Sequence, residues 1–203
     1  MHPIERLRMV ARAGREDPTL LGREAASALA SFAGDPAGLV TACRRLVGRQ
    51  PTCGPVWWVA ARVISAADPA DEAWRAGDEL ARDPTTAALA YELPEDATAV
   101  VLGHPEVVAA ALIRRGDVRA LVVDALDEGA SLVSALRRAG GQGELVPEAG
   151  LAAAVATAGV VLVEAVAMGP GGLVAVKGSG AAAAVARLRG VPVWAVAAAG
   201  RLL

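Results

Sequence analysis

The loop around Lys177 carries the residues best suited to chemistry in this chain of 203 residues. Lys177 is the only lysine among 20 basic residues, and Gly178-Ser179-Gly180 follows it directly. The alanines 181–184 favour a helix, so these small residues lie where the first backbone N–H groups of that helix have no internal partner. Such a helix start suits an anion, and a compact ammonium group beside it adds to that preference. The loop is either an anion site or a tight packing turn between a strand and a helix.

A carboxylate directly follows the apolar run 160–163. Glu164 is expected at the C-terminal tip of a buried strand, where charged groups are rarely buried without a partner. Either Lys177 or an arginine neutralises it, or it faces a solvent-filled pocket. Asp124 and Glu128, at the end of a neighbouring run, could join it in a carboxylate cluster.

His104 lies just past another expected strand, in the sequence Gly103-His104-Pro105-Glu106. Its imidazole could polarise a ligand. The same four residues also suit a plain helix entry, with Pro105 in the first turn and Glu106 complementing the helix dipole. Both readings stay open.

Several common catalytic and binding motifs are excluded. The residue before Lys177 is not the glycine that a Walker A loop needs, and no glycine completes a GxGxxG pattern after Gly180. A Ser179 nucleophile would need a base, and the histidines are His2 and His104. Cys43 and Cys53 have no metal-ligand spacing and are expected to be buried thiols. We therefore predict no metal and no cofactor.

The first part of the chain, from residue 3 to about 83, predicts successive helices separated by Asp-Pro and similar breaks. The tryptophans here, Trp57 among them, are expected in the core rather than as a stacking platform. After residue 94 short β-branched runs alternate with helical segments, which indicates parallel βαβ units and a sheet covered on both faces. The expected strands are 98–102, 118–124, 144–146, 160–163 and 192–197. The expected helices between them are 106–115, 131–139, 148–156 and 181–189.

The sequence thus predicts an α/β protein with a helical domain, 1–90, followed by a Rossmann-like parallel-sheet domain, 91–203. In such sheets ligands bind at the carboxyl ends of the strands. Here these ends are 103–104, 124–129, 164–172 and the Lys177 loop. Gly171 and Gly172 are counted among the candidate ligand-binding residues for this reason.

The composition favours a compact globular protein, with 54% apolar and 21% charged residues. The net charge is −2, and the arginines are interspersed with acids without a basic stripe, so nucleic acid is not an expected partner. The N-terminal residues lack the apolar core of a secretory signal. The longest uncharged run is too short to span a membrane. We expect a cytoplasmic protein.

The segment 160–197 carries a family resemblance, with the sequence VVLVEAVAMGPGGLVAVKGSGAAAAVARLRGVPVWAVA. It resembles the C-terminal signature of the translation initiation factor 2B alpha/beta/delta family, which includes methylthioribose-1-phosphate and ribose-1,5-bisphosphate isomerases. In that family a strand ends in Gly-Ala-Asp, and a glycine-containing loop, Asn-Lys, Gly-Thr, a helix and a Val-Pro strand follow. Three upstream segments also resemble the family. Residues 144–148 resemble its strand followed by Pro-Asp, and residues 98–112 resemble its first Rossmann strand and helix. The sequence Gln50-Pro51-Thr52 resembles its Arg-Pro-Thr motif.

The departures from that pattern concern the catalytic positions. Val166 stands where the isomerases carry the aspartate of Gly-Ala-Asp, and Glu164 replaces the glycine. Gly103 aligns with their cysteine. Gln50, with Arg49 beside it, replaces the arginine of Arg-Pro-Thr. Acid/base catalysis does not survive the loss of both proton-transfer groups unless others replace them.

The resemblance implies a sugar-phosphate isomerase or CoA-transferase-like fold, and a homodimer or heteromer formed through the second domain. It favours a non-catalytic relative that binds a phosphorylated sugar or nucleotide, or a protein partner. A divergent isomerase or lyase rebuilt around Glu164, His104 and Lys177 is the alternative. A structural dimerisation module with a filled pocket is the third hypothesis.

Overall fold

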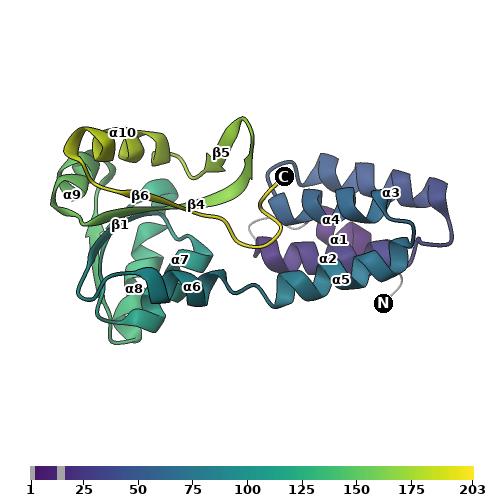
Figure 1. Cartoon of the computed structure of the whole chain (residues 1–203), viewed down its shortest axis with the longest axis horizontal. Helices are drawn as coiled ribbons and strands as arrows, with labels where there is room; N and C mark the ends of the chain where they lie inside the picture. Colours follow the sequence, from purple (N-terminus) through teal and green to yellow (C-terminus); the bar gives the residue numbers. More distant parts are fainter. Residues whose placement is uncertain (1–2, 13–16) are drawn as a thin grey trace. The chain divides into compact units, whose positions relative to one another are not determined.

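The computed structural model describes residues 3–12 and 17–203, so His2 lies outside the described part. Helices come first along the chain, and strands and helices then alternate (Figure 1). The described helices are α1 (Pro3–Arg12), α2 (Pro18–Ala30), α3 (Pro36–Arg49), α4 (Gly54–Ser65), α5 (Pro69–Ala81), α6 (Thr85–Glu92), α7 (Glu106–Arg115), α8 (Gly129–Arg138), α9 (Leu151–Thr157) and α10 (Ser179–Arg189). The described strands are β1 (Thr98–Leu102), β2 (Arg119–Val123), β3 (Gln142–Val146), β4 (Val160–Gly169), β5 (Gly172–Ala175) and β6 (Val193–Val196).

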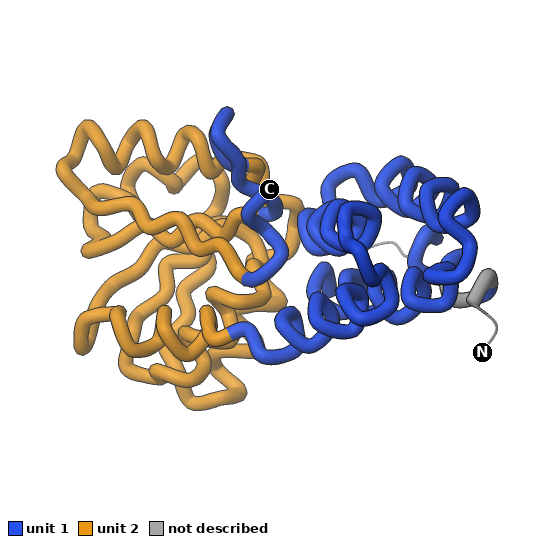
Figure 2. The backbone as a smooth tube through the Cα atoms, turned by 45° about the vertical axis from the view of Figure 1, so that its right-hand side comes forward, with its two compact units in different colours: residues 1–83, 166–173, 199–203 blue, residues 84–165, 174–198 orange. Residues whose placement is uncertain are grey.

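The chain divides into two compact units (Figure 2). The helical unit comprises 1–83, 166–173 and 199–203, and the sheet unit comprises 84–165 and 174–198. The helical unit thus includes two late segments of the chain, and α6 belongs to the sheet unit. The expected domains, 1–90 and 91–203, stay a prediction about which parts fold independently.

The strands form one sheet in the order β3-β2-β1-β4-β5, and β6 pairs with β4. Pairing is parallel between β1 and β2, β2 and β3, β1 and β4, and β4 and β6. The chain runs outward from β1 to β3 and then returns to the other side of β1 for β4. The predicted α/β class with a parallel sheet is confirmed, and the topological switch point lies between β1 and β4.

Successive residues of β1, β2 and β4 face two separate cores of the sheet unit, as the two-residue period of a strand requires. Val101 and Val122 pack in the core that contains residues of α7 and α8. Val100 and Leu121 pack in the core that contains residues of α9 and α10. In Figure 1, α7 and α8 accordingly lie on one face of the sheet, and α9 and α10 lie on the other. Continuous apolar strands are needed because both faces are covered.

Three Asp-Pro pairs start helices of the helical unit. The side chain of Asp17 accepts hydrogen bonds from Thr19 N and Leu20 N at the start of α2. Asp35 and Asp68 cap α3 and α5 in the same way. An aspartate at the N-cap satisfies N–H groups that lack an internal partner, and the proline that follows has no N–H to satisfy.

The helices α2, α4 and α5 pack around a glycine. A Cβ atom at Gly22 would lie 2.7 Å from Pro55 Cβ and 2.8 Å from Leu80 Cδ1. The same unit buries Cys43 and Cys53, which confirms the predicted buried thiols. Burial raises the pKa of the Cys43 thiol to about 11.

The tryptophan prediction is wrong for Trp57 and Trp74, which are 41% and 61% exposed. Trp57 is the more informative case. It lies on the outer side of α4, while Val56 and Val59 fill the core. Trp58 is half-buried against the core and lies 4.3 Å from the Arg62 guanidinium, a cation–π contact. The helical spacing of apolar residues did not show which of the neighbouring residues Trp57 and Trp58 faces solvent.

The predicted strand 160–163 is too short, because β4 continues to Gly169. Two later segments pair with its second half: Glu164 aligns with Val196 of β6, and Met168 bridges to Leu202. A strand end set by such distant pairings has no local sequence signal. No helix in the described part of the chain is both long and apolar enough to cross a membrane.

Candidate functional site at the carboxyl edge of the sheet

Three loops meet at Gly103, directly after β1. Gly103 has a φ of 66°, which favours glycine, and its N–H donates to Val123 O at 2.9 Å. A Cβ atom there would lie 3.3 Å from Ala125 O, 3.6 Å from Glu128 Oε2 and 3.8 Å from Val176 Cγ2. The loops that follow β1, β2 and β5 therefore converge at the carboxyl edge, where the sequence predicted a ligand site.

Glu164 lies at the switch point of the sheet. Ala99 aligns with Val160 and Val100 with Val161, so continuing this register places Gly103 opposite Glu164. The Glu164 carboxylate Oε2 accepts a hydrogen bond of 3.0 Å from the backbone N–H of Val108 in the first turn of α7. A negative charge is favourable at a helix N-terminus.

This contact corrects both expectations about Glu164. The residue is within β4 rather than at its tip, because the strand continues. Lys177 does not pair with it: the Lys177 Nζ lies 3.7 Å from Glu148 Oε2 instead. Its partner is a backbone N–H group of another element, and the spacing of side chains in the sequence cannot reveal such a partner.

Asp124 also binds a helix N-terminus. Its Oδ1 accepts a hydrogen bond of 2.9 Å from Gly129 N at the start of α8. Asp124 and Glu164 thus bind the starts of two different helices, α8 and α7. Among residues 3–12 and 17–203, no group of three or more His, Cys, Asp or Glu residues could hold a metal ion.

His104 forms a hydrogen-bonded chain with α8. Its Nδ1 lies 2.6 Å from Ser131 Oγ, and Ser131 Oγ donates to the Glu128 carbonyl at 2.7 Å. Since the single hydroxyl proton of Ser131 is used in that bond, the serine oxygen accepts from His104 and Nδ1 carries a proton. In the neutral imidazole, Nε2 is then a hydrogen-bond acceptor on an exposed side chain. Pro105 is the N-cap of α7 rather than its first helical residue.

The Lys177 loop leads into α10, as the sequence predicted. Gly178 is the N-cap with a φ of 95°, and no side chain caps the helix start. A Cβ atom at Gly178 would lie 3.0 Å from Leu102 Cδ2, so the loop packs on the end of β1. Lys177 is exposed, with 72% of its side chain accessible.

Ser179 is the unusual residue of this loop. It is only 7% exposed, and its Oγ has no hydrogen-bond partner among the residues that the structure describes. An unsatisfied buried hydroxyl costs folding free energy, on the order of 1–3 kcal/mol. Such groups are uncommon in folded proteins and need an explanation.

The other predicted site residues belong to the helical unit. Gln50 is buried, and its Nε2 donates to Val10 O at 2.7 Å, which ties the end of α3 to α1. Arg49 is exposed on α3. Gly171 lies in the turn between β4 and β5, and Gly172 begins β5 with a φ of 126°. That these four residues belong to the same site as the Lys177 loop stays a prediction.

Val166, at the position of the isomerase aspartate, also lies in the helical unit. A Cβ atom at Gly54 would be only 2.5 Å from Val166 O, so the backbone of β4 touches the start of α4. Gln50-Pro51-Thr52 lies directly before this helix start. Neither Val166 nor Gln50, two of the motif positions in the family resemblance, has a side chain that can act as a general acid or base.

Two contact residues were not identified from the sequence. Ser131 orients His104, and Glu148 approaches Lys177. Both partners come from elements distant in the chain, so only the fold brings these pairs together.

A helical N-terminal part and a parallel sheet with both faces covered place the chain in the α/β class. No family model matches the chain, and no curated protein matches it by sequence. Solved structures do match. The translation initiation factor eIF-2B of Pyrococcus horikoshii OT3 superposes with a TM-score of 0.83 at 14% identity, over 98% of this chain and 79% of that one.

Two further structures have the same architecture. A chain of the tetrameric eIF2B-beta2-delta2 complex from C. thermophilum gives a TM-score of 0.77 at 18% identity, over 98% of this chain and 77% of the other. The 5-methylthioribose 1-phosphate isomerase of P. horikoshii OT3 gives a TM-score of 0.65 at 17% identity, over 95% of this chain and 66% of that one. The chain therefore has the fold shared by initiation factor 2B subunits and this isomerase, which confirms the sequence resemblance at the level of the fold.

Proposed function

We propose that this protein is a non-catalytic binding protein with the initiation factor 2B fold, and that the Lys177 loop binds the phosphate of a phosphorylated sugar or nucleotide. The observation that carries the proposal is the buried Ser179 hydroxyl without a partner at the start of α10. A bound phosphate oxygen would accept its proton. The helix dipole and the Lys177 ammonium group would stabilise the negative charge.

Four helices, α7, α8, α9 and α10, begin at this edge, and α10 is the best suited to an external anion. The helix α9 has only seven residues and follows a 3₁₀ turn that begins with Glu148. The first turn of α7 already binds Glu164, and that of α8 binds Asp124. The first turn of α10 contains no acidic residue and has no side-chain cap. A Cβ atom at Gly180 would meet nothing within 4 Å, so there is space beside the helix start.

The ion pair between Lys177 and Glu148 is compatible with ligand binding. The two atoms lie 3.7 Å apart, and the side chains are 72% and 53% exposed. Exposed pairs contribute little to stability, about 0–1 kcal/mol. A phosphate group can therefore displace Glu148 at low cost.

Loss of proton-transfer groups supports binding without turnover. Gly103 has no side chain, and Val166 has an aliphatic one. One observation favours the alternative of a rebuilt isomerase or lyase: His104 has an acceptor nitrogen on an exposed ring at the same edge. That histidine is the residue on which this alternative depends.

We also propose that the chain assembles with a second copy or with a related subunit. One structural relative was solved as a tetrameric complex of two kinds of subunit. A binding protein of this kind could report ligand occupancy to its partner subunit. A purely structural dimerisation module remains the third hypothesis, and it requires that no anion binds.

The experiment is a titration of wild type and Lys177→Met with ribose 5-phosphate and with inorganic phosphate, followed by melting temperature. Ligand that binds the folded state stabilises it by about 2.7 kcal/mol at a hundred times its dissociation constant. For about 200 residues this raises the melting temperature by roughly 5–10 °C. Lys177→Arg is the matched control, because it keeps the charge.

The proposal predicts a rise for wild type, a smaller rise for Lys177→Arg and none for Lys177→Met. Equal responses of all three proteins would place the anion elsewhere. No response of wild type to either compound would leave the loop as a packing turn.

A further inference from the structure

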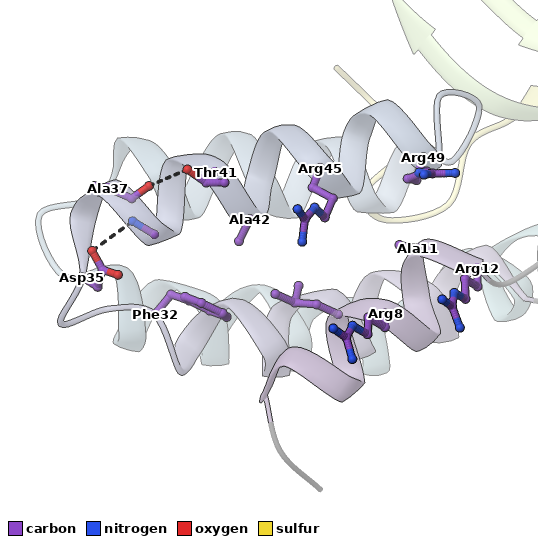
Figure 3. A pocket seen from close by; sticks show the side chains of 12 residues that line it. Arg8, Ala11, Arg12, Phe32, Asp35, Ala37, Thr41, Ala42, Arg45 and Arg49 are labelled. Atoms are coloured by element: carbon purple, nitrogen blue, oxygen red, sulfur yellow. Dashed lines mark hydrogen bonds between the residues drawn. The ribbon is translucent and has the colours of Figure 1, made fainter.

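A cavity of about 600 Å³ lies in the helical unit, between α1 and α3. Figure 3 shows its two walls, with Phe32 and Ala37 towards one end. This volume is in the usual range of small-molecule sites, roughly 300–1,000 Å³. The cavity is formed entirely by residues of the helical unit, so it is separate from the Lys177 loop.

Four arginines gather at the other end of this cavity. Arg8 and Arg12 lie one turn apart on α1, and Arg45 and Arg49 lie one turn apart on α3. In Figure 3 the two pairs stand on opposite walls. The two pairs lie more than 30 positions apart in the sequence, so the cluster is visible only once α1 and α3 are packed together.

Within residues 3–12 and 17–203, few acidic groups offset the charge at this end. Arg8 forms an exposed contact of 3.4 Å with Glu5. Arg12, Arg45 and Arg49 form no ion pair with any other residue in the described part of the chain. The one acidic residue of the lining, Asp35, is at the opposite end and is used to cap α3 through Gly38 N at 2.9 Å.

The rest of the lining is apolar. Leu7 and Ala42 are buried in its floor, and Phe32 is half-buried at the end away from the arginines. Small residues, Ala11 and Ala37 among them, leave the space open. An apolar floor with a cluster of guanidinium groups at one end has the polarity of a site for an amphipathic molecule.

We propose that this cavity binds an amphipathic organic anion with a flat apolar body and a doubly charged head, such as an aryl phosphate. Guanidinium groups bind phosphate oxygens through paired, charge-assisted hydrogen bonds. The arginines of the two walls hold the phosphate group between them, and the ring lies against Phe32 and Ala42. The arginines of the walls call for an anionic head, and the apolar floor and the cavity volume call for an apolar body of small-molecule size.

The test uses 1-naphthyl phosphate as the probe and isothermal titration calorimetry as the readout. The full chain carries Lys177→Met throughout, so that the Lys177 loop does not contribute. Ligands of this size reach dissociation constants of about 1 mM or better. Saturable binding in this range is expected, whereas 1-naphthol and inorganic phosphate alone should bind at least about tenfold more weakly, since each makes half of the contacts.

Variants separate the two halves of the site. Arg12→Gln with Arg45→Gln should weaken probe binding by about tenfold or more. The matched control is Arg23→Gln with Arg44→Gln, which removes two exposed arginines of α2 and α3 outside the lining and should change binding less than about twofold. Ala37→Trp, which fills the apolar end and leaves the arginines in place, should abolish probe binding.

Circular dichroism and melting temperature verify that each variant is folded, which is expected because all substituted side chains are exposed. The proposal is overturned if the two arginine double variants weaken binding equally, since the attraction is then non-specific. It is also overturned if Ala37→Trp binds the probe like its parent, or if the parent protein gives no saturable heat up to about 5 mM probe.

Discussion

The Glu164 carboxylate accepts a hydrogen bond of 3.0 Å from the backbone N–H of Val108. A side chain of the protein itself thus binds the N-terminus of α7, at the switch point where open α/β sheets bind their ligands. A glycine occupies the position of Glu164 in the family that the sequence resembles. In this chain an acidic side chain thus occupies the place that an external anion could take at α7, whereas no side chain caps the start of α10.

Glu164→Ala should lower the free energy of unfolding by about 1–2 kcal/mol, because the helix N-terminus loses a charged acceptor. Glu164→Gln keeps an acceptor oxygen and should lose less. Urea denaturation measures both. Glu148→Ala is the control: its side chain is 53% exposed and should cost less than about 0.5 kcal/mol. If Glu164→Ala behaves like the control, the contact does not stabilise the fold.

Ser179→Ala should separate folding from binding. Without ligand the variant should be as stable as wild type, or more stable by up to about 1 kcal/mol, because an unsatisfied buried hydroxyl is removed. Its response to ribose 5-phosphate should disappear. Ser134→Ala, at an exposed position of α8, should change neither property. A destabilised Ser179→Ala that still responds to the ligand would assign the hydroxyl a structural role.

Asp117 should contribute to the loss of stability between pH 4 and pH 2. Hydrogen bonds from Arg115 Nε at 2.9 Å and from Asp96 N at 3.1 Å lower its pKa from 3.8 to about 2, the arginine being the larger cause. A carboxylate whose folded pKa is depressed stabilises the protein above its unfolded pKa, and this stability is lost as the pH falls through about 2.

Asp117→Asn should therefore be less stable than wild type at pH 7 and lose less stability between pH 4 and pH 2. Urea denaturation midpoints at pH 7, 4, 3 and 2.5 test this expectation. Asp71→Asn, which removes an exposed pair with Arg75, is the matched control. Parallel pH curves for wild type and Asp117→Asn would contradict the assignment.

Turnover of 5-methylthioribose 1-phosphate should be absent or very slow, because Gly103 and Val166 cannot transfer protons. Loss of one general acid or base typically costs 10²- to 10⁴-fold, so loss of two places the rate far below a typical kcat of about 10 s⁻¹. A coupled or NMR assay of product formation measures the rate. A rate within about tenfold of 10 s⁻¹ that His104→Ala removes would instead support the rebuilt isomerase.

Light scattering at micromolar concentration should give a mass near twice 20.5 kDa, the mass of one chain. The sheet unit exposes Leu188 at 85% and Val193 at 39%, on α10 and on strand β6. Leu188→Glu should shift the equilibrium towards monomers, whereas Arg187→Glu, a charge change at the neighbouring position, should do so less. A wild-type mass near 20.5 kDa would contradict assembly of identical chains and leave a related subunit as the partner.

The sequence by itself determined the elements and the class of the fold. Asp-Pro pairs fix helix starts at Asp17, Asp35 and Asp68 through local hydrogen bonds. Alternating strands and helices after residue 94 required parallel pairing, because a crossover helix returns the chain to the same edge. The helix after Gly180 was predictable for the same local reason, since alanine favours helix and glycine allows the turn before it.

Tertiary structure alone decided which groups neutralise the charges and where β4 ends. Glu164 could be recognised as unusual, but its partner is a backbone N–H 56 residues away in the chain. Arg8, Arg12, Arg45 and Arg49 form a cluster only because α1 and α3 pack side by side. The burial of Ser179 likewise depends on neighbours from other elements. Local sequence patterns encode backbone preferences, whereas electrostatic partners depend on contacts that form only when distant segments pack together.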